Sequence, residues 1–226
     1  MEIVLATRNP DKVREISAIM APLDLVIVPL EHFGPVPEVV EDGDTLEANA
    51  LKKARVVRDA TGRCALADDT GLEVDALGGA PGIYSSRYAG EDATYEDNTR
   101  KLLQEMAQVP PARRGARFRT VAALALVPEA ADRVPRRLRE QSGGDSGMMD
   151  SERPDALVGE GMLEGRIAGE SRGTSGFGYD PVFEAAGDGK TLAEIGLDEK
   201  NRISHRYRAL VELRELMLRC GLCGER

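Results

Sequence analysis

Residues 64–71 read Cys-Ala-Leu-Ala-Asp-Asp-Thr-Gly, so a short apolar run leads directly into two carboxylates, a hydroxyl and a glycine. The apolar run predicts a buried strand, and the acids come where that strand is expected to end. In α/β proteins ligands bind beyond the carboxyl ends of strands. Paired acids there suit Mg²⁺, which leaves its other positions to water and phosphate oxygens. The alternative is that Asp68 and Asp69 are solvated turn acids.

The segments around this stretch alternate short apolar runs with helical patterns, which predicts an α/β fold. Asp44 and Glu47 predict an acidic capping box, and Thr94 predicts a second helix start. Strands are expected at 3–6, 25–28, 64–67 and 116–127, and helices at 13–20, 44–59, 94–106 and 204–219.

The bulk composition is that of an ordinary globular protein. The 226 residues are 42% hydrophobic and 31% charged, enough for one large domain or a domain with two lobes. A net charge of -9 argues against a nucleic-acid-binding surface. No apolar stretch approaches the roughly 20 residues that span a bilayer, and no basic leader precedes the first strand. We therefore expect a cytoplasmic protein with no nucleic-acid or membrane partner.

Two further features stand apart from this pattern. The stretch 128–155 nearly lacks apolar residues, which predicts a mobile surface insert. Cys220 and Cys223 have the spacing of a redox or metal pair, but they follow a helix instead of opening one, and with Cys64 and two histidines they make a poor zinc set. A structural role for these cysteines is the favoured interpretation.

The first expected strand is followed by a motif that could bind an anion, Thr7-Arg8-Asn9-Pro10-Asp11-Lys12. Amides at a helix N-terminus bind phosphate, and a hydroxyl and an ammonium group would complete the cradle. The chain has no P-loop, and Asn9-Pro10 alone is also a good start for a helix.

Two later motifs combine aromatic, acidic and basic groups. In Ser175-Gly-Phe-Gly-Tyr-Asp-Pro181, glycines flank Phe177, which could stack on a base. A tight turn with one buried aromatic is the alternative. In 199–206, Lys200, His205 and Arg206 come at the start of the last helix, where cations oppose the helix dipole unless an anionic ligand binds. A solvated charged face is the alternative there.

Together these segments resemble the non-canonical purine NTP pyrophosphatases, also called dITP/XTP or inosine triphosphate pyrophosphatases. They follow the family's order over nearly the whole chain, apart from the insert and the C-terminal tail. The matching pieces are Leu5-Ala-Thr-Arg-Asn9 with Lys12, Asp44-Thr-Leu-Glu-Ala-Asn-Ala50 with Lys53-Ala-Arg55, the acid block that begins at Ala67, Gly173 to Pro181, and Glu199-Lys-Asn201 through His205-Arg206. One departure is Arg8, which stands where many members have glycine.

The resemblance implies cleavage of ITP, dITP or XTP to the monophosphate and pyrophosphate. It assigns catalysis to Asp69 with Asp68 as its helper, and Mg²⁺ binding to Glu41 and Asp69. His205 or Arg206 could donate to the keto group that distinguishes these bases from adenine. The substrate-binding residues implied are Thr7, Arg8, Asn9, Pro10, Asp11, Lys12, Lys53, Thr70, Arg87, Phe177, Gly178, Tyr179, Asp180, Lys200, His205 and Arg206.

The expected architecture is a central mixed, twisted sheet flanked by helices, in a single domain whose two lobes close an active-site cleft. A homodimer is implied by the resemblance. Three other functions stay open: a pyrophosphatase for other altered nucleotides such as modified pyrimidines, a nucleotide-binding module that does not hydrolyse its ligand, and a structural α/β domain with solvated acids.

Overall fold

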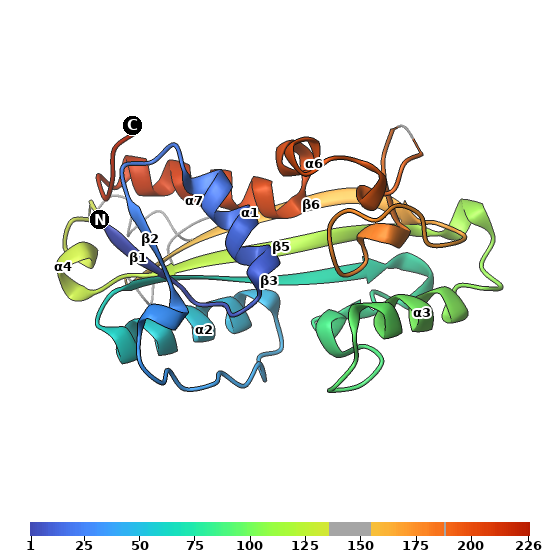
Figure 1. Ribbon diagram of the computed structural model, residues 1–226, viewed down its shortest axis with the longest axis horizontal. Coiled ribbons are helices and arrows are strands. Elements are labelled where there is room, and N and C mark those ends of the chain that lie inside the picture. Colours follow the sequence, from blue (N-terminus) through green and yellow to red (C-terminus); the bar gives the residue numbers. More distant parts are fainter. Residues whose placement is uncertain (136–154, 188) are drawn as a thin grey trace. The chain divides into compact units, whose positions relative to one another are not determined.

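The computed structural model describes residues 1–135, 155–187 and 189–226 (Figure 1). The chain forms two compact units. Unit 1 consists of Met1–Asp69, Thr120–Gly161 and Arg206–Arg226, and unit 2 consists of Thr70–Arg119 and Met162–His205.

A mixed sheet has the strand order β2-β1-β3-β5-β6-β7, and β4 lies beside β3. β1 pairs in parallel with β2 and with β3, whereas β4 and β7 pair antiparallel with β3 and β6. The predicted fold class, a mixed sheet flanked by helices, is confirmed. The strands are β1 (Glu2–Leu5), β2 (Val26–Pro29), β3 (Cys64–Val74), β4 (Pro81–Gly82), β5 (Gly115–Ala125), β6 (Ala156–Ile167) and β7 (Phe183–Ala185).

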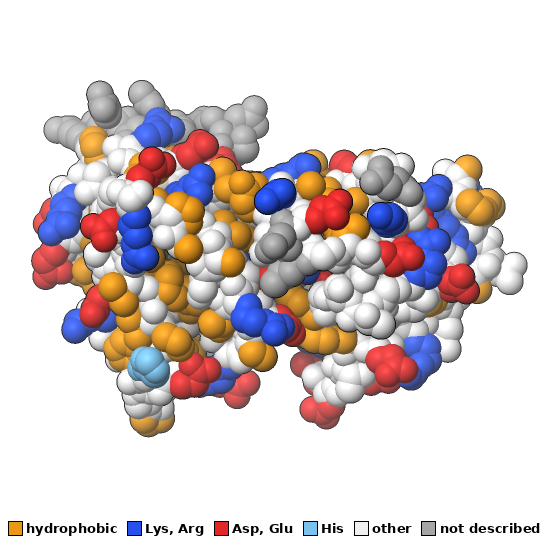
Figure 2. Space-filling view, turned by 45° about the horizontal axis from the view of Figure 1, so that its top comes forward, with side chains coloured by type: hydrophobic (Ala, Val, Ile, Leu, Met, Phe, Trp, Pro, Cys, Tyr) orange, Lys and Arg blue, Asp and Glu red, His pale blue; other side chains and the backbone are white. Residues whose placement is uncertain are grey.

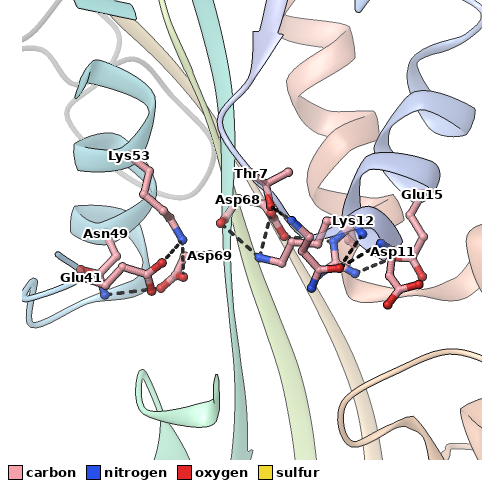
Figure 3. A network of polar contacts seen from close by, with 11 residues as sticks. Thr7, Asp11, Lys12, Glu15, Glu41, Asn49, Lys53, Asp68 and Asp69 are labelled. Carbon is pink, nitrogen blue, oxygen red and sulfur yellow. Dashed lines mark hydrogen bonds and ion pairs between the residues drawn. The ribbon is translucent and has the colours of Figure 1, made fainter. Parts of the chain in front are cut away.

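In unit 1, helices cover the two faces of the strands (Figures 1 and 3). α1 (Pro10–Met20) and α7 (His205–Arg219) pack on one face, where Ile16 and Leu213 join a core with Leu66 of β3. α2 (Leu46–Thr61) lies on the other face. The helical spacing of apolar residues predicted α1 and α7, whereas the expected capping box predicted α2.

β3 is longer than the sequence predicted. It continues to Val74, so Asp68 and Asp69 lie inside the strand and not beyond its end. Every residue from Cys64 to Asp69 is buried. A run of apolar residues predicts a strand only as far as the run lasts. β3 continues because basic side chains from other segments accompany its two acids, which the local pattern does not show.

The helix starts were predicted with mixed success. α2 begins after Thr45, whose hydroxyl accepts from the Ala48 amide at 3.0 Å, so the predicted cap at Asp44 is wrong by one residue. Thr94 caps α3 (Tyr95–Glu105) as predicted, and Asp97 completes a reciprocal capping box.

Unit 2 has a core of its own. α3 contributes Leu102, which is fully buried with Leu72 of β3, Phe118 of β5 and Phe183 of β7. The short α6 (Leu197–Ile203) leads to the start of α7. This core fixes the segments on either side of residues 173–180, which carry the predicted base-binding motif.

The predicted insert is partly described. Its first residues form α4 (Pro128–Ala131), and Val134 is buried in the core of unit 1, so the expectation of one apolar-poor loop from residue 128 is wrong at this end. Asp155 is paired with Arg55 and Arg58 of α2. The remainder, 136–154, lies outside the described residues.

The surface carries both signs of charge. On the face shown in Figure 2, acidic and basic side chains are interspersed. The surplus of negative charge is therefore not gathered into one acidic patch on that face. Among the helices of the described ranges, none combines the length and apolarity needed to cross a membrane.

Candidate active site

The two acids of β3 point to opposite faces of the sheet (Figure 3). Successive side chains of a strand alternate between faces, so Asp68 and Asp69 cannot act on one point as neighbours. Asp69 faces α2, whereas Asp68 faces α1 and α7. The expectation of a paired acid cluster is therefore wrong, and each acid belongs to a separate network.

Asp69 shares a lysine with a second carboxylate. Lys53 Nζ lies 2.7 Å from Asp69 Oδ1 and 3.0 Å from Glu41 Oε1. Asn49 Nδ2 lies 3.5 Å from Asp69 Oδ2. Asp69, Asn49 and Lys53 are all buried, and Glu41 is half-buried. Two carboxylates from distant segments thus converge on one ammonium group.

α2 brings this cluster together. Asn49 and Lys53 are four residues apart, so they lie on the same face of the helix. Asn49 Oδ1 also accepts from the Gly43 amide at 2.8 Å, which fixes the loop that carries Glu41. A Cβ at Gly43 would come within 2.7 Å of that oxygen, so the close approach requires glycine.

Burial and neighbouring charges shift the pKa values in this cluster. Burial raises the pKa of Asp69 above its ordinary value, and the nearby Glu41 charge adds to the effect while Lys53 opposes it. Burial acts to lower the pKa of Lys53, but the charges of Asp69 and Glu41 outweigh it and raise that pKa. The cluster therefore combines a charged lysine with a carboxylate of increased basicity.

On the opposite face, Asp68 lies between two cations. Lys12 Nζ is 3.0 Å from Asp68 Oδ1, and Arg206 Nε is 3.0 Å from Asp68 Oδ2. Arg206 Nη1 also donates to Glu15 Oε2 at 2.5 Å. The side chains of Asp68, Arg206 and Glu15 are all almost fully buried. Arg206 is thus held between two buried carboxylates, in unit 1.

These contacts fix the charge states of the network. Burial alone would raise the pKa of Asp68, but Lys12 and Arg206 hold it well below its usual range. Burial alone would lower the pKa of Arg206, whereas Asp68 and Glu15 raise it. Asp68 is therefore charged at neutral pH and paired with both Lys12 and Arg206.

The Thr7–Lys12 motif opens α1 as predicted. Asn9 caps the helix, accepting from the amides of Asp11 at 2.9 Å and Lys12 at 3.4 Å, and Pro10 follows it. Thr7 Oγ1 accepts from the Asn9 amide at 3.1 Å. The helix amides in this structure are therefore bound by the Asn9 side chain.

Two charged residues of the motif point elsewhere. Arg8 donates from Nη2 to the carbonyl oxygen of Val36 at 3.0 Å, which ties the first loop to the segment before Glu41. Asp11 is paired with Arg14, one turn later in α1. Of the charged side chains in this motif, Lys12 is the one that forms an ion pair with Asp68.

In unit 2, the motif around Phe177 forms a second cluster. Asp180 Oδ2 accepts from the Phe177 amide at 2.8 Å and from Lys200 Nζ at 2.6 Å. Lys200 Nζ also lies 4.8 Å from the centre of the Phe177 ring. The centres of the Phe177 and Tyr95 rings are 5.8 Å apart. Asp180 and Lys200 are buried, while Phe177 is half-buried and so retains exposed ring surface.

The other predicted binding residues of unit 2 each have contacts of their own. Gly178 accepts from Thr99 at 3.3 Å, and the buried Tyr179 donates its hydroxyl to the Ser85 carbonyl at 2.9 Å. Thr70 is half-buried in β3, and Arg87 lies over the Tyr84 ring and 3.7 Å from Glu91. His205 is buried and stacks on Phe118, with the ring centroids 4.4 Å apart.

Two participants were missed from the sequence. Glu15 lies four residues before Ile19, on the apolar face of α1, and an acid at such a position is a signal for a buried partner. Asn49 lies four residues before Lys53, which places both on one face of α2. Each signal is a spacing of four residues along one helix.

The cysteine pair fits the structural interpretation. Cys220 is buried in the core of unit 1 and Cys223 is half-buried against it. Burial raises the pKa of both thiols. Raised thiol pKa values disfavour the reactive thiolate, so this pair lacks the setting of a redox site.

The chain is similar to known proteins along nearly its whole length. It is 46% identical over 213 residues to a dITP/XTP pyrophosphatase of Geobacter sulfurreducens, with 94% of each chain covered. It is 41% identical over 220 residues to a dITP/XTP pyrophosphatase of Caldanaerobacter subterraneus, with 97% of each chain covered.

Solved structures agree with these relatives. A HAM1 protein from Coxiella burnetii has a TM-score of 0.77 at 38% identity, covering 96% of this chain and 98% of that one. A protein of Mycobacterium abscessus described as nucleoside-triphosphatase / dITP/XTP pyrophosphatase has a TM-score of 0.68 at 38% identity, covering 94% and 98%. The model of the Ham1 family matches residues 3–216. The resemblance predicted from the motifs is thus confirmed, and the chain belongs to the Ham1 family.

Proposed function

We propose that this protein hydrolyses the purine nucleoside triphosphates ITP, dITP and XTP to the monophosphate and pyrophosphate. The observation that carries the proposal is the convergence of Glu41 and Asp69 on Lys53, in a chain related end to end to proteins named dITP/XTP pyrophosphatase. A carboxylate pair beside a lysine can accommodate both a divalent cation and a polyphosphate.

The residues present fit Mg²⁺. Glu41 Oε1 and Asp69 Oδ1 both lie within 3.0 Å of Lys53 Nζ, so the two carboxylates face the same point. In the described part of the chain no group of three or more His, Cys, Asp or Glu side chains gathers for a metal. Two carboxylates suffice, since Mg²⁺ commonly takes one or two and completes its shell with water and phosphate. Bound there, Mg²⁺ would neutralise phosphate charge.

Asp69 is the proposed general base. Its carboxylate accepts a proton from a water molecule whose oxygen attacks the α-phosphorus. The bond from the α-phosphorus to the bridging oxygen breaks, and pyrophosphate leaves. Its place in β3, with the Lys53 ammonium 2.7 Å away, supports this role, because Lys53 can hold a phosphate beside the carboxylate.

Two lysines are proposed to bind the phosphates. Lys53 stands beside Asp69, and Lys12 is held by Asp68 on the other side of β3. In this arrangement Asp68 acts as a positioning residue, since its low pKa keeps it charged and unable to serve as a base. This makes its expected role as a helper of Asp69 more specific.

The base is proposed to bind in unit 2. Phe177 offers a half-buried ring for stacking, and Lys200 beside it can donate to a keto oxygen. His205 of the same unit stacks on the Phe118 ring and stays a predicted donor to the base. Arg206 is assigned a different role from the expected one, because its guanidinium group is bound by Asp68 and Glu15 in unit 1.

The test is pyrophosphate release from ITP, XTP, GTP and ATP, each with Mg²⁺ and with a chelator. Release from ITP and XTP that needs the metal, with little from GTP and ATP, is expected. Binding without release would establish a nucleotide-binding module instead, and release from modified pyrimidine triphosphates would establish the related pyrophosphatase. A homodimer, a cleft between two lobes and a cytoplasmic location stay predictions, and the first is tested by the mass in solution.

A further inference from the structure

Residues 173–180 of unit 2 form the loop that carries Phe177, and we call them the base loop. Its C-terminal end is fixed by Asp180, which accepts from both Lys200 and the Phe177 amide. A loop that offers a ring for stacking must hold that ring in place before the ligand binds, or binding loses free energy to ordering. Contacts that fix the N-terminal end of the base loop should therefore strengthen base binding as well.

Arg172 stands immediately before the base loop and joins three separate segments. Its Nη2 donates to Glu184 Oε1 of β7 at 2.7 Å and to the Gly189 carbonyl at 2.8 Å. Its Nε lies 3.4 Å from Glu194 Oε2. One planar guanidinium group with several fixed donors can make all three contacts at once.

The backbone at Arg172 is held as firmly as its side chain. The Arg172 amide donates to the Pro181 carbonyl at 2.9 Å, just beyond the other end of the loop. The Arg172 carbonyl accepts from the fully buried Thr191 hydroxyl at 2.8 Å. The amides of Thr174 and Ser175 donate to the Ala193 carbonyl, each at 3.1 Å. The two ends of the base loop are thus brought together.

Close packing leaves the loop little freedom at this end. Gly173 has φ +82°, and a Cβ there would come within 2.3 Å of the Ala193 carbonyl group. Glu194, which contacts Arg172, also closes the capping box of the 3-10 turn Leu192–Glu194 by accepting from the Thr191 amide at 2.8 Å. The turn on which the loop rests is therefore bonded to Arg172.

We propose that Arg172, with Glu184 as its buried counter-ion, is a positioning residue for nucleobase binding. It acts by setting the base loop so that Phe177 is in place before the nucleotide arrives. This inference rests on the proposed function for what the loop binds, but the ordering of the loop is a property of the protein without ligand. The Arg172 side chain contacts neither phosphate-binding lysine, so its effect falls on the affinity for the base.

The chain offers a matched control. Arg166 of β6 binds the same Glu184 carboxylate through Nε, but it does not adjoin the base loop and its side chain is 57% exposed. Arg166→Gln removes the same charge from the same carboxylate as Arg172→Gln does. A difference between the two variants therefore reports the connection to the loop and not the loss of an ion pair at Glu184.

The first measurement needs no ligand. Hydrogen exchange followed by mass spectrometry compares peptides that cover 173–180 in wild type, R172Q and R166Q. We expect faster exchange in these peptides for R172Q, because the turn that carries the Ala193 carbonyl, the acceptor for the Thr174 and Ser175 amides, loses its contact with Arg172. For R166Q we expect wild-type exchange. Unchanged exchange in R172Q, or equal acceleration in both variants, would overturn the proposal.

The second measurement is steady-state hydrolysis of ITP. For R172Q we expect KM to rise about tenfold with kcat within about twofold of wild type, the pattern of lost ground-state binding. R166Q should match wild type, and R172K, which keeps the charge but not the planar fork, should fall between them. A parallel fall in kcat, or an unchanged KM, would refute the role.

The two measurements separate failure of this inference from failure of the proposed function. If wild type does not hydrolyse ITP, the proposed function fails, while the exchange comparison still decides whether Arg172 orders the loop. If R172Q does not fold, R172K decides by the same two readouts. Wild-type exchange and KM in folded R172K would then count against the proposal.

Discussion

Replacing Arg206 by methionine tests whether this residue stabilises the site through Asp68 and Glu15. Arg206 is 2% exposed, and its guanidinium group binds both carboxylates, which are themselves buried. Methionine preserves much of the length and the packing volume of arginine but removes the charge and the hydrogen bonds. The two carboxylates then lose their shared cation inside the protein.

The expected loss of stability is large. Removing one partner of a buried ion pair costs about 3–5 kcal/mol, because a charge is left in a poorly solvated place. For a chain of this length each kcal/mol shifts Tm by about 2–4 °C, so Tm should fall by roughly 6–20 °C. Since whole proteins are stable by only about 5–15 kcal/mol, the variant should be folded but fragile.

The assay is urea unfolding followed by circular dichroism, with Arg208→Gln as control. Arg208 is exposed on the same helix, and exposed substitutions cost about 0.5 kcal/mol or less. A double-mutant cycle of Arg206→Met with Glu15→Gln should show a coupling of about 0.5–3 kcal/mol. A loss below about 1 kcal/mol for Arg206→Met, or no coupling, would refute the assignment of Arg206 to this buried network.

Three further predictions follow from the same structure. Asp69→Asn should reduce pyrophosphate release from ITP about a hundredfold or more while leaving the circular dichroism spectrum unchanged, and near-normal release would disprove its role as base. The pKa of Asp68 is depressed in the folded state, so the stability that its charge contributes is fully present above the ordinary carboxyl pKa of about 4 and is lost as the pH falls through the folded-state value. The difference in urea midpoint between wild type and Asp68→Asn should therefore be constant from about pH 7 to 5 and shrink below about pH 4. A difference that already shrinks at neutral pH would contradict this. Gly159→Ala should destabilise the protein by about 1–3 kcal/mol, because its Cβ would lie 2.4 Å from the Ala209 carbonyl oxygen. The control is Gly169→Ala, since a Cβ at Gly169 would meet open space. Equal urea midpoints for the two variants would show that α7 moves to accommodate the extra methyl group.

Much of the fold could be predicted because its signals are local. The apolar spacing in α1 and α7, the Thr94 cap and the long buried β5 were all read from neighbouring residues. The end of β3 could not be predicted in this way. Its two acids are tolerated inside the sheet because they pair with the side chains of Lys12, Lys53 and Arg206. These partners are distant in sequence, so the pattern around β3 does not predict them.

The site was predicted as a set of residues but not as an arrangement. Asp68 and Asp69 are neighbours in sequence, yet each has its own network, and the same holds for His205 and Arg206. Glu15 is 191 residues from Arg206 along the chain, so their pairing depends on packing that sequence spacing does not encode. The sequence interpretation gave adjacent residues one function, whereas the geometry of strands and helices points neighbouring side chains in different directions.

The opposed directions of Asp68 and Asp69 make chain length within β3 as important as residue identity. Side chains on a strand repeat every two residues, so deleting one residue between 64 and 67 while β1 and β3 stay paired would exchange every following position between the faces. Asp69 would then face Lys12 and Arg206, and Thr70 would take its place beside Lys53. A single codon lost from this strand would leave the composition of the site almost unchanged and yet turn the proposed proton acceptor to the other side of the sheet.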